Sequence, residues 1–195
     1  MTRALGVAAV LVGLGGAPGG AERVLLTREQ ALAEMFPGHG PAFVERFTPS
    51  DADRRAIASA SGAQSPGPNV EVIRVMGTAG DTAGFALVLD EKGKYQPITF
   101  MVGVGTDLAV RGVQVMVYRE DRGDEVRHGR FLRQYRGKRL SDPIRTHEDI
   151  VNVTGATISV QSLNRGVRRA LATLDVLYRA APRPPAATSP LHAGR

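Results

Sequence analysis

Four apolar segments rich in β-branched residues follow one another in the middle of the chain. They cover Val70–Met76, Gly84–Asp90, Ile98–Val104 and Val110–Tyr118. Segments of this length and composition predict β-strands, and the short turn-forming stretches between them predict hairpins. The sequence therefore predicts an antiparallel meander with one face that helices have to bury.

Helical patterns lie on both sides of these segments in the chain. Thr27 and Gln30 have the spacing of a capping box, which predicts a short helix that a Pro-Gly pair ends. Further helices are expected near Asp51–Ala60 and over Val126–Tyr135, and a long one from about Ser159, where apolar residues recur at three- and four-residue steps. The predicted fold class is α+β, a single domain with helices packed on an antiparallel sheet.

The two ends of the chain differ from its centre in composition. Residues 1–21 contain one arginine near the start, an uncharged apolar run over Ala4–Leu14 and a stretch of small residues, as secretory signal peptides do. The run is too short to span a bilayer, so we expect cleavage and an exported domain, periplasmic or otherwise extracytoplasmic. An uncleaved, membrane-associated anchor and a cytoplasmic protein stay open as alternatives.

The remaining boundaries follow from local composition. Residues 22–69 are interpreted as an N-terminal helical or loop segment, and residues 70–180 as the main domain. Residues 181–195 are rich in proline and alanine, which predicts a disordered tail that could be removed without effect on folding.

Composition excludes several classes of site. The chain has no cysteine, which rules out disulfides, thiolate metal sites and a catalytic thiol. The consecutive residues His147, Glu148 and Asp149 point in different directions, and no second histidine stands at helical spacing, so no metal site is predicted. The net charge is +6, but basic residues are spread thinly and aromatic residues make up only 5%, so nucleic-acid binding is not expected. Four arginines are interpreted as a solvated helix face, with a docking patch for an acidic redox partner as the alternative: Arg127, Arg130, Arg133 and Arg136.

The segment from Asp149 to Ser159 carries the strongest chemical signal. It reads as an extended apolar stretch that turns at Gly155 into the start of a helix, with hydroxyl groups at Thr154, Thr157 and Ser159. Helix N-termini present unpaired N–H groups and a partial positive charge, which favour a phosphate. The alternative is that these hydroxyl groups only cap the helix.

The stretch from Thr154 to Ser159 resembles the S/T-G-A-T-x-S motif of the FMN-binding domain family, which includes the flavin-carrying subunits of the sodium-translocating NADH:quinone reductase and of the Rnf electron-transport complex. In that family the phosphate of FMN is esterified to the last threonine of the Gly-Ala-Thr triplet, which Thr157 matches. The resemblance implies FMN attached covalently to Thr157 by a flavin transferase that uses FAD and Mg²⁺. The implied cofactor-binding residues besides Thr157 are the rest of the motif and a glutamate: Thr154, Gly155, Ala156, Ile158, Ser159 and Glu120.

The resemblance extends beyond the motif. Tyr95–Val104 and Val113–Glu120 resemble a strand pair of the family whose second strand ends in a glutamate, and Phe131–Lys138 resembles its Phe-Leu-x-Gln-Phe/Tyr-x-Gly-Lys helix. Two features depart from the family. Val151 stands where an aspartate is usual, with Asp149 two residues earlier, and the loop after Glu120 lacks the commoner Thr-Pro-Gly form.

The resemblance implies an exported electron-transfer flavoprotein that exchanges electrons with a membrane-bound or periplasmic redox protein. Because the sequence shows no strong general base and no serine nucleophile motif, an electron carrier or redox-complex subunit is expected rather than a stand-alone enzyme. Two alternatives stay open: a non-covalent FMN-binding or assembly subunit, and a basic binding module without a cofactor.

Overall fold

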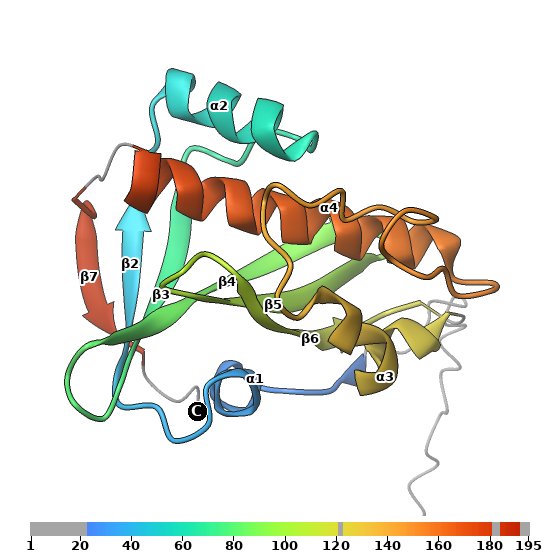
Figure 1. The fold of residues 1–195 in the computed structure, drawn as a ribbon, viewed down its shortest axis with the longest axis horizontal. Helices are drawn as coiled ribbons and strands as arrows, with labels where there is room; N and C mark the ends of the chain where they lie inside the picture. The colour runs from blue at the N-terminus through green and yellow to red at the C-terminus, as the bar shows by residue number, and fades with distance from the viewer. Residues whose placement is uncertain (1–22, 121–122, 181–183, 192–195) are drawn as a thin grey trace, which may run out of the picture.

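A seven-stranded antiparallel sheet forms the centre of the computed structural model, which describes residues 23–120, 123–180 and 184–191 (Figure 1). The strand order is β1-β6-β5-β4-β3-β2-β7. The strands are β1 (Arg23–Val24), β2 (Ala42–Phe47), β3 (Val70–Met76), β4 (Thr82–Lys92), β5 (Pro97–Gly105), β6 (Val110–Tyr118) and β7 (Ala187–Pro190). The fold class predicted from the sequence, α+β in a single domain, is confirmed.

The four strands expected from the sequence form the predicted meander, β3 to β6. Register pairs such as Leu87↔Val102 and Val102↔Val113 place apolar residues side by side across β4, β5 and β6. The pairing of β3 with β4 is shorter, because it ends at Ile73↔Ala86 while β4 continues along β5 to Lys92. The far ends of β3 and β4 therefore lie apart.

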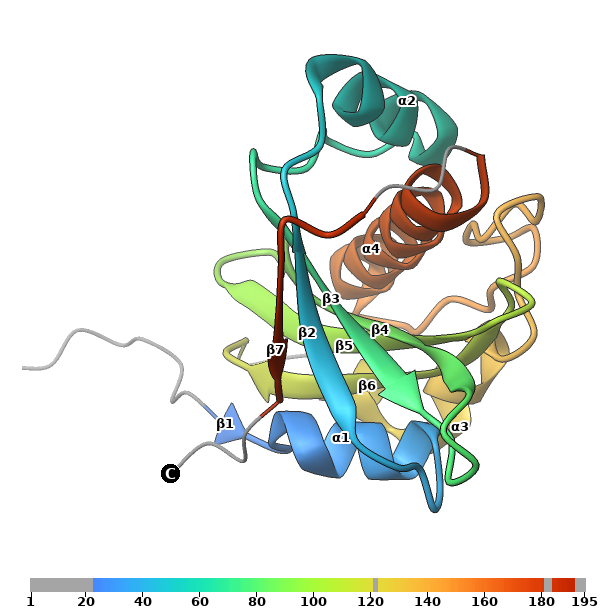
Figure 2. The ribbon, with the colours of Figure 1, turned by 90° about the vertical axis from the view of Figure 1, so that its left-hand side faces the viewer.

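The long helix α4 (Thr157–Leu174) crosses one face of the sheet and buries it (Figure 2). Its apolar residues, such as Leu163 and Val167, pack on Phe100 and Val102 with no exposed surface. Apolar side chains in a 3.6-residue period make one helix face that fits a sheet, so burial stabilises both elements. Helix α2 (Asp51–Ser61) lies on the outer side of α4, away from the sheet.

The opposite face of the sheet is covered by α1 (Arg28–Met35), as Figure 2 shows. Thr27 and Gln30 form the predicted capping box at its start. Leu32 and Met35 pack against Ile73 and Met101 in a second apolar cluster. The sheet is therefore buried on both faces, whereas the sequence predicted one.

Two predicted helices differ in detail. The stretch expected as one helix over Val126–Tyr135 is broken into short turns: η1 (Asp124–Arg127), α3 (Gly129–Leu132) and η2 (Arg133–Tyr135). His128 has an extended backbone between the first two and glycine follows it, so one continuous helix cannot form. Helix α4 begins two residues before the predicted Ser159 and continues into a π-helical segment over Asp175–Ala180. None of the helices in the described residues is long and apolar enough to cross a membrane.

The N-terminal segment is not separate from the main domain, because β1, α1 and β2 of residues 23–69 belong to the same sheet and cores. The predicted signal peptide over residues 1–21 lies outside the described residues.

The predicted disorder of residues 181–195 is wrong for part of that segment. Ala187–Pro190 forms β7, which pairs with β2 over Arg46↔Ala187 to Phe43↔Pro190. Arg46 also donates to Ser189 Oγ, and Leu191 packs at the edge of the α1 cluster. Composition does not reveal this strand, because its side chains are largely exposed and its partner β2 lies far away in the sequence.

Removing residues 184–195 is therefore expected to destabilise the domain instead of leaving it unchanged. The deletion exposes the backbone of β2 and removes several hydrogen bonds, so the free energy of unfolding should fall by about 1–2 kcal/mol. Urea denaturation of the shortened chain measures the loss. A deletion of residues 192–195 alone, which keeps β7, is the control, and equal midpoints for both shortened chains would contradict the role of β7.

Candidate functional site

The start of α4 lacks a side-chain cap. The residue before the helix is Ala156, and within the described part of the chain no side chain accepts a hydrogen bond from the first amides. Thr154 is exposed, and Ser159 lies inside the first turn, 5% exposed, with its Oγ 3.4 Å from the hydroxyl of Tyr118. The alternative that these hydroxyl groups only cap the helix is therefore wrong. The first N–H groups of α4 remain free to bind a ligand.

Thr157 is the first residue of α4 and its side chain is exposed. Its Oγ1 accepts a hydrogen bond from Asn152 Nδ2 at 3.0 Å. Gly155 has a φ of +81°, a conformation that glycine adopts without strain, and a Cβ at this position would meet open space. The chain thus turns sharply before the helix and presents the Thr157 hydroxyl to solvent.

A cleft of about 620 Å³ opens beside Thr157. Its lining includes every candidate residue of the motif from Gly155 to Ser159, together with Glu120. Lys94 and Tyr95, from the turn between β4 and β5, form the other side. The Tyr95 ring is 73% exposed, and the Lys94 ammonium lies 4.9 Å from its centre. The cleft therefore combines an apolar ring, a positive charge and a hydroxyl group.

Glu120 shapes this cleft through the backbone of the turn. One carboxylate oxygen accepts hydrogen bonds from the amides of Tyr95 and Gln96, at 2.7 and 3.0 Å. These charge-assisted bonds fix the turn that carries Tyr95. Glu120, a candidate from the family resemblance, lines the cleft, and these hydrogen bonds are with the protein's own backbone.

A second cleft of about 380 Å³ lies on the other side of Thr157. Its lining includes Arg145, Arg165 and Arg168. Arg165 Nη2 donates to Ser162 Oγ at 3.1 Å, which ties the guanidinium to the helix. Thr157 thus lies between two clefts. Arginines line this one, whereas the first cleft has one charge of each sign, Lys94 and Glu120.

The loop before the motif is held by a half-buried ion pair and by hydrogen bonds. Asp149 pairs with the Lys138 ammonium at 2.8 Å and accepts from the Arg145 amide at 2.9 Å. The Tyr135 hydroxyl donates to Asn164 Oδ1 at 2.6 Å, and burial raises the pKa of Tyr135 far above its usual range. Tyr118 and Tyr135 are both buried and belong to the core.

The pKa of Asp149 is lowered. Partial burial opposes ionisation, but the hydrogen bond from Lys138 and those from the backbone amides of Arg145 and Ile144 outweigh it. A lowered pKa means that ionised Asp149 stabilises the folded state above its unfolded pKa of about 3.9, and that this stabilisation is lost as pH falls through the lower, folded pKa.

Asp149→Asn should therefore reduce stability at neutral pH and flatten the acid dependence. The asparagine side chain cannot pair with the Lys138 ammonium and does not titrate. As the pH falls below the unfolded pKa of about 3.9, we expect the free energy of unfolding to fall more steeply for the unaltered chain than for the variant. Urea denaturation at a series of pH values measures both, and parallel curves would contradict this role for Asp149.

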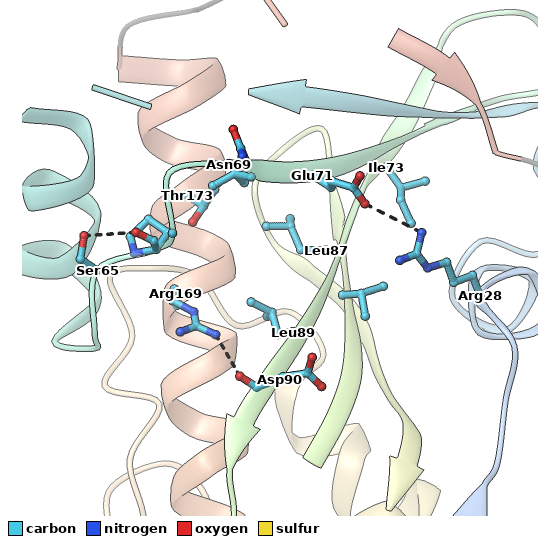
Figure 3. Close-up of a pocket in the computed structure, with 14 residues that line it drawn as sticks. Arg28, Ser65, Asn69, Glu71, Ile73, Leu87, Leu89, Asp90, Arg169 and Thr173 are labelled. Atoms are coloured by element: carbon cyan, nitrogen blue, oxygen red, sulfur yellow. Dashed lines mark hydrogen bonds and ion pairs between the residues drawn. The ribbon is translucent and has the colours of Figure 1, made fainter. Parts of the chain in front are cut away.

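Another pocket of about 360 Å³ lies between the far ends of β3 and β4 and helix α4 (Figure 3). Its charged groups already have partners in the protein, since Arg28 pairs with Glu71 and Arg169 donates to the Asp90 carbonyl. None of the motif residues lines it. Within residues 23–120, 123–180 and 184–191, no group of three or more His, Asp or Glu side chains is arranged to hold a metal ion.

Sequence analysis missed several residues of the site. Asn152, Lys94 and Tyr95 were not among the candidates, although the first touches Thr157 and the other two line its cleft. Tyr95 carried one available signal, because a large aromatic residue in a turn between two strands has little to pack on. Val151 is 72% exposed, and its amide donates to Gln134 Oε1 at 2.8 Å.

The arginines of the α3 region are not one helix face, because that helix is broken. Arg130, Arg133 and Arg136 are nevertheless exposed, and Arg127 is half-buried. Arg130 lines a further hollow of about 570 Å³ with Val151 and Asn152, so part of this basic group lies close to the site.

Comparisons with known proteins agree with this geometry. The FMN-binding domain family matches residues 93–172, which run from the Tyr95 turn through most of α4. The crystal structure of Shewanella oneidensis NqrC is similar in fold, with a TM-score of 0.50 and 17% sequence identity over 70% of this chain and 82% of that chain. A comparison with curated proteins finds no significant match. Residues 93–172, less than half of the chain, therefore match an FMN-binding domain, and this match supports FMN as the cofactor.

Proposed function

We propose that this protein is an exported electron-transfer flavoprotein that carries FMN as a phosphoester on Thr157. The observation that carries the proposal is the position of the Thr157 hydroxyl, exposed at an uncapped helix N-terminus between two clefts, one of which is lined by arginines. A phosphate on this oxygen would lie beside the free amides of α4. The helix dipole stabilises such a charge by about 0.3–1 kcal/mol.

The residues around Thr157 suit the other parts of FMN. Tyr95 and Ile158 offer apolar surface. Lys94 and the arginines of the second cleft bring positive charge, of which Arg145 and Arg165 also pair with Glu148 and Glu91. Because Glu120 fixes the turn of Tyr95 through two backbone hydrogen bonds, this surface exists before the cofactor arrives. Bound FMN supplies the redox chemistry, since its ring system accepts and returns electrons.

Attachment would require a flavin transferase with FAD and Mg²⁺. The Thr157 oxygen forms a bond to the FMN phosphorus of FAD, the pyrophosphate bond breaks, AMP leaves, and the hydroxyl proton is released. The protein's own contribution is an accessible hydroxyl group in a fixed place. The exposure of Thr157 at the rim of two clefts is consistent with access by a second protein.

The surroundings of the clefts favour a redox partner with acidic groups, either membrane-bound or periplasmic. Tyr95, Val151 and Ile158 are among the few exposed large apolar residues of the described chain, and they lie at or beside the Thr157 clefts. Arg130 and Arg133 are exposed nearby, and the structure gives them no acidic partner within the described residues. Exposed apolar groups with a charged rim are typical of protein interfaces.

The direct test is production of the chain with an active flavin transferase in a host that exports it. We expect a yellow protein whose flavin fluorescence stays with the band in denaturing electrophoresis. A protein that binds FMN but loses it on denaturation would instead support the non-covalent alternative, which the exposed Val151 in the usual aspartate position favours. A colourless protein would contradict the proposal.

A further inference from the structure

We propose that Asn152 is the positioning residue that orients the Thr157 hydroxyl for flavin transfer. The inference rests on the proposed function, because it concerns how Thr157 receives FMN. The Asn152 side chain donates a hydrogen bond from Nδ2 to Thr157 Oγ1, at 3.0 Å.

Asn152 is held firmly on both sides. Ile150 is 2% exposed, and the amide of Val151 donates to Gln134. On the other side the Ala156 amide donates to the carbonyl of Val153 at 3.0 Å, which closes the turn before α4. The backbone therefore brings Asn152 back over the first residue of the helix. Val151 points to solvent and cannot take this role.

The second polar atom of the Asn152 side chain is the key observation. Its Oδ1 is buried and has no hydrogen-bond partner within the described residues. A buried amide oxygen without a partner destabilises the folded state, so its retention beside an exposed hydroxyl calls for an explanation. The orientation that leaves Oδ1 without a partner is the one in which Nδ2 donates to Thr157 Oγ1, so the contact with Thr157 is kept at the expense of Oδ1.

This hydrogen bond suits both states of Thr157. Before transfer Nδ2 donates to one lone pair of the Thr157 oxygen, as in this structure. The hydroxyl proton and the second lone pair then stay available to a base and to the incoming phosphorus. In the transfer the oxygen–phosphorus bond forms, AMP leaves FAD, and the proton goes to a base of the transferase or to water. After transfer the ester oxygen has no proton, and Nδ2 can continue to donate to it. Asn152 itself gains and loses nothing.

The test measures flavin transfer to the purified full chain by purified transferase with FAD and Mg²⁺. Asn152→Leu keeps the size of the side chain and removes both hydrogen-bonding atoms. We expect kcat for flavin transfer to fall about three- to tenfold, which corresponds to the loss of one neutral hydrogen bond. The KM for the domain should change little. Asn69→Leu, the same change at an exposed position before β3, should leave both constants unchanged.

A double-mutant cycle separates positioning from a structural role. Serine at position 157 lets the hydroxyl rotate more freely than threonine does. In the Thr157→Ser background, Asn152→Leu should therefore lower kcat by roughly threefold more than it does in the unaltered chain. Effects of Asn152→Leu that are equal in the two backgrounds, or a normal kcat in the single variant, would overturn the inference. Thermal unfolding and peptide mass spectrometry accompany each variant. If the unaltered chain receives no flavin on Thr157, the proposed function fails, whereas normal transfer to the leucine variant refutes only the role of Asn152.

Discussion

Thr157→Ala is expected to abolish covalent attachment of FMN completely. Alanine has no oxygen to form the phosphoester, so the effect is all-or-none and not a reduced rate. The fold should survive, because the Thr157 side chain is exposed and its hydroxyl does not cap α4. We expect the free energy of unfolding to change by less than about 1 kcal/mol. Mass spectrometry of the peptide from Val151 to Ser162 should show the mass of FMN less one water only in the unaltered chain.

Two further variants make the result specific. Thr154→Ala removes a neighbouring exposed hydroxyl and keeps the acceptor, so the flavin should remain attached. Thr157→Ser keeps an oxygen but rotates more freely, so partial attachment is expected. Flavin found on Thr154 or Ser159, or retained by the Thr157→Ala variant, would contradict the assignment.

Gly166→Val should be among the most destabilising substitutions in the domain. Gly166 lies in the middle of α4, where a Cβ would overlap the Phe100 ring and lie 3.1 Å from Cγ of Glu91. Glycine therefore allows the helix to approach the sheet closely. Both neighbours are buried, so they cannot move aside into solvent. Valine should lower the free energy of unfolding by about 2–3 kcal/mol through overpacking.

The same contact carries an ion cluster. Glu91 on β4 is buried and lies 2.9 Å from Arg169 and 3.7 Å from Arg165, one on each side of Gly166 along the helix. Burial raises the pKa of Glu91, although the two arginines oppose the rise. Moving α4 outward would lengthen both ion pairs.

A double-mutant cycle checks that the overlap is the cause. Phe100→Leu removes the far edge of the ring and should by itself destabilise the core, but it should reduce the additional cost of Gly166→Val. Urea denaturation of the four proteins measures the coupling. If the losses of unfolding free energy caused by Gly166→Val and Phe100→Leu simply add, the overlap with Phe100 does not explain the need for glycine.

The sequence predicted those elements whose signals are local. The strands β3 to β6 were predicted because each carries its own apolar pattern and each turn lies next to its strands in the chain. The capping box of α1 spans four residues and was predicted for the same reason. Thr157 and Glu120 were predicted through a motif resemblance, and both lie at one cleft.

Contacts between distant segments could not be predicted in this way. Strand β7 depends on β2, more than a hundred residues earlier, and its own composition is that of a loop. The apolar residues over Val126–Tyr135 recur with a helical period, which predicted one helix. In the structure they reach the core from three short helical segments instead. Burial of both sheet faces likewise depends on where α1 packs.

The sequence by itself determined the fold class, the meander and the threonine that matches the FMN motif, because these depend on residues close together in the chain. Only the tertiary structure decided that the start of α4 is uncapped, that Asn152 contacts Thr157 and that Tyr95 and Lys94 form the other wall of the cleft. The physical reason is that a binding site is made where segments meet in space. That meeting is fixed by the packing of α4 on the sheet, which no single segment encodes.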